Sequence, residues 1–316
     1  MNISDAARLS ETLLGALQQV IVGKEHVLRQ LLLGLYGGGN ILLEDFPGLA
    51  KTLIARLMAQ VSGLEFKRIQ FTPDLLPGDI TGGVIYNQKQ AEFVFRPGPL
   101  FTNLVLADEV NRAPPKTQAA LLEVMQERQV TVEGITYPMP VPFVVLATQN
   151  PIELEGTYPL PEAQLDRFMM RLRVGYPSLE EERQILALRG ARQQEKIDLQ
   201  PVIDAVQLLQ MQATVEQVHA SAAIESYIVS LAAATRHHSQ VQVGASPRGS
   251  LALYQLARAH AMIQARDFVL PDDVKAMAIP ALAHRLLLKP ELWMRGIHAE
   301  DVVRDLLERT PIPKAE

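Results

Sequence analysis

The chain has 316 residues, of which 48% are hydrophobic and 21% are charged, so it holds enough apolar material for two folded domains. It contains no cysteine, which excludes disulfides and thiolate metal sites, and its net charge of -5 argues against nucleic acid as a partner. The most apolar stretch, residues 31–43, is interrupted by glycines, and the first residues lack a secretory pattern. We therefore expect neither export nor membrane insertion, and a cytoplasmic location.

Helices are expected first, over about residues 5–20 and 27–36, and an apolar strand then begins at Ile41. This strand runs into a loop and a further helix, as in a phosphate-binding loop. Such a loop aims backbone N–H groups and a helix N-terminus at phosphates, while a lysine neutralises charge and a hydroxyl binds Mg²⁺. Lys51 and Thr52 fit these last two roles. The sequence predicts a nucleoside triphosphate site at Asp45-Phe46-Pro47-Gly48-Leu49-Ala50-Lys51-Thr52.

Two residues of this loop depart from the usual G-x-x-x-x-G-K-[ST] pattern, since Asp45 and Ala50 stand in place of glycines. We expect Ala50 to be entering the helix, where alanine is favourable. The Asp45 carboxylate would repel phosphates unless it turns away to hydrogen-bond the loop backbone. Taken alone, the segment is also compatible with an ordinary Gly-Pro turn between a strand and a helix.

Further apolar strands are expected at residues 66–71, 104–107 and 143–148, with spacings long enough for crossover connections. This alternation predicts an α/β fold with a parallel sheet between layers of helices. Between the strands, residues 82–95 and 129–137 alternate around turns and predict two β-hairpins.

Polar residues follow two of these strands, at the edge where parallel sheets bind ligands. Asp108 and Glu109 end one strand, and we expect Asp108 to hold Mg²⁺ through water and Glu109 to polarise an attacking water. Asn150 ends another and would orient that water. The alternatives are a buried strand ending in a solvated acidic turn, and an asparagine that opens a turn before Pro151.

From Ser178 onward the pattern is helical, with almost no strand signal. Ser178 and Glu181 form a capping box, and Ser246-Pro247 and Pro271 mark later helix starts. We therefore expect an α/β nucleotide-binding domain over residues 1–177, a connecting helix and linker over 178–200, with the polar stretch 190–196, and an α-helical lid over 201–316.

Five motifs follow one another along the chain, which are Pro47–Thr52, Asp108–Gln118, Ala147–Pro151, Glu155–Phe168 and Gly244–Arg248. In these motifs the chain resembles the MoxR family of AAA+ ATPases, and the resemblance extends over about residues 21–313. It implies a P-loop domain with a helical lid that binds ATP and Mg²⁺, hydrolyses ATP and assembles into a ring, with partner proteins that carry von Willebrand factor A domains. Such rings, often hexamers, remodel or mature protein complexes as chaperones do. The hairpins resemble the helix-two insert and the pre-sensor hairpin of this clade.

The resemblance also assigns roles to residues outside the phosphate loop. Arg167 matches the arginine finger that reaches ATP in the neighbouring subunit, and Arg248 matches the second-sensor arginine. Arg248 also lies in the first turn of a helix, where the helix dipole disfavours a cation, so an anion such as ATP phosphate should compensate. Val22 and Gly23 would contact the adenine side. Arg112 is a weaker candidate for contact across subunits.

Each arginine has a plainer alternative, which is a surface pair with Asp166 for Arg167 and a short ion pair on the lid for Arg248. Two other functions remain open. One is a nucleotide-gated scaffold with little hydrolysis, which has less need of Glu109, Asn150 and Arg167. The other is a magnesium-chelatase-type motor subunit, against which the MoxR-like segment 111–115 argues.

Overall fold

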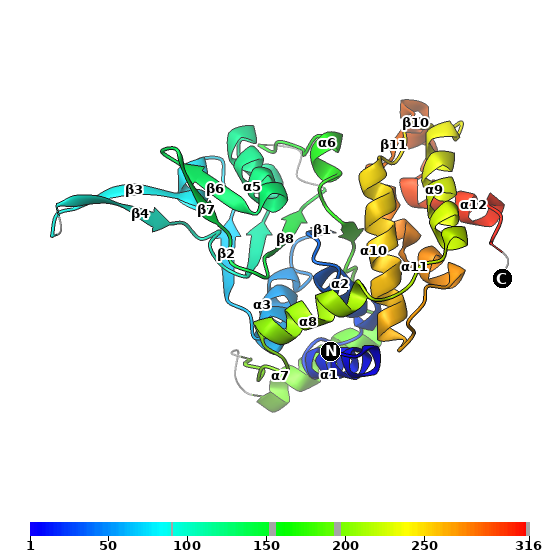
Figure 1. Cartoon of the computed structure of the whole chain (residues 1–316), viewed down its shortest axis with the longest axis horizontal. Coiled ribbons are helices and arrows are strands. Elements are labelled where there is room, and N and C mark those ends of the chain that lie inside the picture. The colour runs from blue at the N-terminus through cyan, green and yellow to red at the C-terminus, as the bar shows by residue number, and fades with distance from the viewer. Residues whose placement is uncertain (90, 152–155, 193–196, 314–316) are drawn as a thin grey trace.

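The sheet of the α/β part is parallel throughout, as expected, and a fifth strand that was not predicted, Met170–Leu172, lies at its edge. The computed structural model describes residues 1–89, 91–151, 156–192 and 197–313 (Figure 1). The sheet order is β2-β5-β8-β1-β9, and each strand begins and ends within about one residue of its expected bounds where the sequence predicted it. The strands are β1 (Ile41–Glu44), β2 (Phe66–Gln70), β5 (Leu104–Asp108), β8 (Val144–Gln149) and β9 (Met170–Leu172).

Alternate residues of the central strands pack against different layers. Leu104 and Leu106 share a core with the N-terminal helices, whereas Val105 and Ala107 pack with Leu121 of the helix α5 on the other face. Both faces of the sheet are therefore buried, which explains why these strands are continuous apolar runs. The flanking helices are α1 (Ile3–Gln18), α2 (Glu25–Tyr36), α3 (Lys51–Val61), α4 (Pro77–Thr81), α5 (Pro115–Glu127) and α6 (Glu162–Leu165).

The two predicted hairpins are confirmed, and both extend from the sheet away from the helical part (Figure 1). They comprise β3 (Gly82–Asn87) with β4 (Glu92–Pro97), and β6 (Gln129–Val132) with β7 (Ile135–Pro138). The ring of Phe95 stacks on Tyr137 with centroids 3.9 Å apart, so the hairpins contact each other.

The second half is helical, and the expected helix starts are confirmed. Ser178 and Glu181 form the capping box, and the Ser246 hydroxyl accepts the N–H of Arg248. The helices are α7 (Leu179–Arg192), α8 (Ala205–Val215), α9 (Ala222–His237), α10 (Pro247–Ile263), α11 (Pro271–Leu282) and α12 (Ala299–Arg309), with the 3-10 helices η1 (Val110–Arg112), η2 (Ala283–Arg285) and η3 (Pro290–Arg295). A short antiparallel pair, β10 (Val241–Val243) with β11 (Leu287–Leu288), was not expected.

One continuous core joins the sheet to the lid. Helices α1 and α2 pack against α8 and α10 of the lid, and α1 also packs against α3 beneath the sheet (Figure 1). The N-terminal helices therefore belong structurally to both halves. The boundaries at 177 and 200 stay a prediction, and Glu155 and residues 193–196 lie outside the described residues. In the part of the chain that the structure describes, no helix is both long and apolar enough to cross a membrane.

Candidate functional site

The phosphate loop connects β1 to α3 and folds around the ammonium group of Lys51. Its Nζ donates hydrogen bonds to the backbone oxygens of Asp45, at 2.6 Å, and of Phe46, at 3.0 Å. Burial lowers the pKa of Lys51, against the opposing effect of the nearby carboxylates. The lysine is thus held in the loop, at the N-terminus of a helix, where an anion is favoured.

The Asp45 carboxylate turns away from the phosphate side, as the sequence predicts. Its Oδ1 accepts the N–H of Phe46 at 2.9 Å, and its Oδ2 accepts the N–H of Gly175 at 2.6 Å. The side chain is buried, and the residue is only 6% exposed. A carboxylate that is satisfied by two backbone donors ties the loop to the segment before α7 instead of repelling a phosphate.

The expectation for Ala50 is wrong. Ala50 precedes the first helical residue and adopts a left-handed conformation with φ of 57°. This is a region where a Cβ is disfavoured by about 1–2 kcal/mol and glycine is not. The preference for glycine at this position of the pattern therefore has a backbone cause, and alanine here carries strain.

Asp108 lies at the carboxyl end of β5, where three side chains converge on it. The Oγ1 of Thr52 lies 3.4 Å from its Oδ2, and the Oγ1 of Thr148 donates to its Oδ1 at 2.6 Å. The guanidinium of Arg68 pairs with Oδ2 at 2.7 Å. The sequence predicted Thr52 beside Asp108 but not Arg68 or Thr148. Arg68 and Thr148 lie on the strands that flank β5, which is the signal that could have identified them.

Glu109 follows Asp108 in a left-handed conformation, with φ of 57°. Its Oε2 accepts a hydrogen bond from Gln70 at 2.7 Å and pairs with Arg112 at 3.2 Å, and its backbone N–H donates to Thr148 at 2.8 Å. Such a backbone costs about 1–3 kcal/mol in a non-glycine residue and is concentrated at functional sites. The carboxylate is thereby held beside that of Asp108.

These groups enclose one cavity of about 430 Å³. Asn150, which is 5% exposed, contributes to its wall as predicted. No group of three potential His, Cys, Asp or Glu ligands occurs among the described residues. The donors Thr52 and Asp108 fit Mg²⁺, which binds through few protein oxygens and takes the rest from phosphates and water. The cavity is lined by Pro47, Gly48, Leu49, Ala50, Lys51, Thr52, Leu53, Arg68, Asp108, Glu109, Thr148 and Asn150.

Val22 and Gly23 lie beside the start of α7 and not in the wall of this cavity. Gly23 has φ of 69°, and a side chain at this position would collide with the Glu181 carboxylate. Lys24 donates to the backbone oxygen of Tyr176, whose ring stacks on Phe46 with centroids 5.6 Å apart. The segment therefore reaches the phosphate loop through these two rings, and its contact with adenine stays a prediction.

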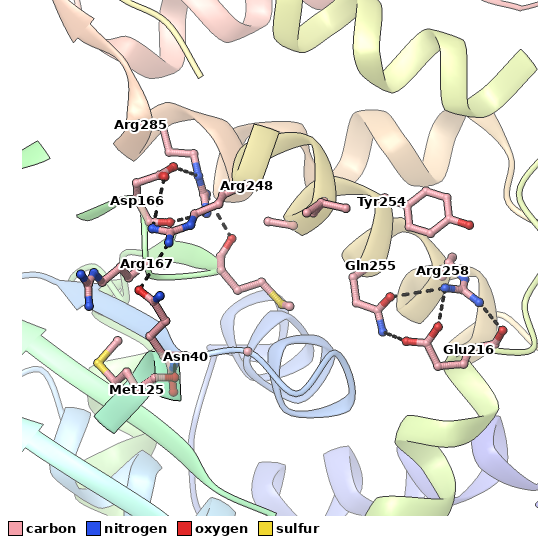
Figure 2. A pocket seen from close by; sticks show the side chains of 15 residues that line it. Asn40, Met125, Asp166, Arg167, Glu216, Arg248, Tyr254, Gln255, Arg258 and Arg285 are labelled. Carbon is pink, nitrogen blue, oxygen red and sulfur yellow. Dashed lines mark hydrogen bonds and ion pairs between the residues drawn. The ribbon is translucent and has the colours of Figure 1, made fainter. Parts of the chain in front are cut away.

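Arg167 and Arg248 lie in a second cavity, of about 480 Å³, between α10 and the beginning of β1 (Figure 2). Asn40, which precedes β1, contributes to its wall, whereas the phosphate loop follows the other end of that strand. A strand of this length spans about 13 Å. Arg248 and the phosphate loop therefore lie at opposite ends of this strand, and the contact of Arg248 with ATP phosphate stays a prediction.

The sequence also allowed a simple ion pair for each of these arginines, and the structure shows such a pair for Arg248 but not for Arg167. Arg248 lies 3.9 Å from the Asp166 carboxylate and donates to Gln126 at 3.3 Å, which is close to the short ion pair considered for it. Arg167 instead donates to the backbone oxygen of Leu122 at 2.9 Å, while the Asp166 carboxylate binds Arg285 and Ser246. A simple Arg167–Asp166 surface pair is thus not what the structure shows.

Two family profiles match separate parts of the chain. Residues 40–170 match the ATPase family associated with various cellular activities, and residues 233–306 match the AAA lid domain. The crystal structure of a candidate ATPase from Cytophaga hutchinsonii superposes with a TM-score of 0.92 at 41% identity, covering 99% of this chain and 97% of that one. The fold and the phosphate loop thus define an AAA+ ATPase.

Sequence relatives refine this class. The chain is 44% identical to Chaperone MoxR1 of Mycobacterium tuberculosis, over 94% of this chain and 80% of the relative. It is 50% identical to YeaC of Bacillus subtilis, an uncharacterised protein, over 94% and 92%, and 33% identical to Protein MoxR of Paracoccus denitrificans, over 92% and 91%. The chain belongs to the MoxR family of AAA+ ATPases.

The left-handed backbone of Ala50 allows a test of how this residue affects the free energy of unfolding. Ala50→Gly should change the free energy of unfolding by less than about 0.5 kcal/mol, because relief of strain offsets the added freedom of the unfolded chain. The matched control is Ala119→Gly, at an exposed site in α5, which should destabilise by about 0.5–1 kcal/mol. Urea denaturation measures both. An equal loss in the two variants would mean that Ala50 is helical.

Proposed function

We propose that this protein is an Mg²⁺-dependent ATPase that hydrolyses ATP to ADP and phosphate and uses the energy for chaperone-like remodelling or maturation of protein complexes. The observation that carries the proposal is the meeting of Lys51, Thr52, Asp108 and Glu109 around one cavity at the carboxyl edge of a parallel sheet. The name of the relative MoxR1 supports the chaperone part.

In this proposal the residues of the cavity divide the work. Lys51 and the N–H groups of the loop bind the β- and γ-phosphates, while Thr52 and Asp108 hold Mg²⁺. The metal supplies neutralisation of the charge that develops on the phosphates during transfer. Glu109 polarises the attacking water and Asn150 orients it. Thr148 and Gln70 keep the two carboxylates in place through the hydrogen bonds described above.

The second cavity supports the proposal that the chain assembles into a homo-oligomeric ring. The family resemblance implies that this ring is a hexamer. Arg167 and Arg248 lie far from the phosphate loop of their own chain, so we assign both to the nucleotide of an adjacent subunit. Arg167 is the proposed finger, and Arg112, which pairs with Glu109, is the alternative. A partner with a von Willebrand factor A domain follows from the family resemblance alone.

Lys51→Ala should weaken binding of Mg·ATP by about 100-fold or more, because it removes the cation from the phosphate site. The fold should persist, since the Nζ hydrogen-bonds to carbonyls of the loop and not to groups of the core. Calorimetry gives the affinity, and thermal unfolding gives the stability. Lys275→Ala, which removes an ammonium that pairs with Asp272 on the lid, is the control and should bind as the parent does. Parent-like binding by Lys51→Ala would exclude this loop as the nucleotide site.

Glu109→Gln should retain ATP affinity within about threefold and lose about 100-fold in turnover, because an amide keeps the shape but polarises water poorly. Phosphate release under saturating ATP measures the turnover. The Gln70 contact can persist in the variant, so a large loss would not come from a displaced side chain. Turnover within twofold of the parent would favour the nucleotide-gated scaffold instead.

A finger that acts across an interface predicts complementation between inactive variants. Lys51→Ala and Arg167→Ala should each be inactive alone. In mixed rings the Arg167→Ala chain keeps its phosphate loop, and a Lys51→Ala neighbour supplies the missing guanidinium. About a quarter of the interfaces are competent after random equimolar mixing, so partial ATPase activity should return and peak near equal ratios. If the two chains share rings and no activity returns at any ratio, Arg167 does not act in trans, and Arg112 is the residue to test.

A further inference from the structure

A buried guanidinium from the lid holds the segment that carries Arg167. Arg285 ends η2, directly after α11, and its side chain is 3% exposed. Its Nε donates to the Asp166 carboxylate at 2.9 Å, and its Nη2 donates to the backbone oxygens of Asp166, at 3.1 Å, and of Phe168, at 2.7 Å. One lid side chain therefore fixes the backbone on both sides of Arg167. Figure 2 shows its contact with the Asp166 carboxylate.

The Asp166 carboxylate extends this contact to a second lid helix. Both of its oxygens lie 2.9 Å from the hydroxyl of Ser246, the residue that caps α10, and Arg248 approaches to 3.9 Å. Asp166 thus joins the end of η2 and the beginning of α10 to the segment before Arg167. Charge-assisted hydrogen bonds of this kind are short and directional, so they define an orientation as well as a distance.

Arg167 itself has weak anchoring by comparison. Its Nη1 donates a hydrogen bond to the backbone oxygen of Leu122, and its Nε is buried with no partner among the described residues. The direction of the side chain is therefore set mainly by the backbone that Arg285 holds. Buried polar atoms normally have partners, so an unpaired Nε indicates a group that is placed for another purpose.

We propose that Arg285 and Asp166 are positioning residues, which orient Arg167 from the lid of the same chain so that its guanidinium meets the triphosphate bound by the adjacent subunit. This rests on the proposed function, in which Arg167 acts in trans. Because the contact comes from the lid, the finger follows the lid when the lid moves. A misplacement of about 1 Å in a group that stabilises a transition state lowers the rate by about 100-fold.

Mixed rings test this inference through an asymmetry. The starting combination is a Lys51→Ala chain, called the donor because it supplies Arg167, and an Arg167→Ala chain, called the acceptor because it holds the ATP that this arginine reaches. Adding Asp166→Asn to the donor should lower the recovered ATPase activity by about tenfold or more, because the donated finger is no longer held. Adding Asp166→Asn to the acceptor should leave the recovered activity within about twofold, since the acceptor has no finger to position.

A second substitution and a control guard against loss of folding. Arg285→Lys in the donor should act as Asp166→Asn does, because lysine cannot reproduce the planar fork of hydrogen bonds. The matched control is Asp272→Asn in the donor. It alters the pair between Asp272 and Lys275, 3.3 Å apart, which lies in α11 of the lid and does not line the cavity. This control should leave the recovered activity unchanged.

The outcomes separate this inference from the proposed function. A loss confined to the donor position supports positioning by Asp166 and Arg285. Equal losses of activity in donor and acceptor would show that Asp166 and Arg285 have a merely structural role. No loss in either would show that Arg167 is held by other contacts. Both results overturn the inference but leave the proposal that Arg167 acts in trans intact. If the Lys51→Ala and Arg167→Ala chains recover no activity in shared rings, Arg167 does not act in trans, and the inference fails together with that part of the proposed function.

Discussion

The parallel pairing of β5 with β8, and of β8 with β1, is the constraint on which the candidate site depends. It sets Ala107 level with Ala147, and Leu43 level with Thr148, so the three strands end together. Asp108 and Thr148 follow these positions and meet at 2.6 Å, while the loop after β1 brings Thr52 to the same carboxylate. A shift of one residue in this register would turn these side chains to the opposite face of the sheet.

The length of β1 separates two charged sites. At its carboxyl end, the carboxylates of Asp108 and Glu109 are balanced by Arg68 and Arg112, and Lys51 is held in the loop. At its other end, the cavity is lined by four arginines, at 167, 248, 258 and 285, and by two carboxylates, at 166 and 216, which leaves an excess of 4 − 2 = 2 positive charges. A partly buried excess of this kind is stabilised by an anion from outside the chain.

The sequence predicted features whose cause is local and missed features whose cause is tertiary. Strands, helix caps and hairpins follow from apolar patterns and turn residues, and the turned carboxylate of Asp45 follows from charge. Arg68 was missed because only the sheet order brings β2 beside β5. Ala50 was misjudged because helix propensity says nothing of the residue before the first turn. Arg248 was placed correctly on its helix, but its distance from the phosphate loop depends on how the lid packs.

That packing links the two ends of the sheet. The phosphate loop contacts the segment before α7 through Asp45 with Gly175 and through Phe46 with Tyr176, and the lid contacts the finger segment through Arg285. Between them, α1 and α2 pack on both the sheet side and the lid helices in one core. Close-packed interiors transmit displacement and do not absorb it. An event at the phosphate loop that shifts the lid is therefore expected to shift Arg167 as well, because separating Arg285 from Asp166 would break a buried ion pair.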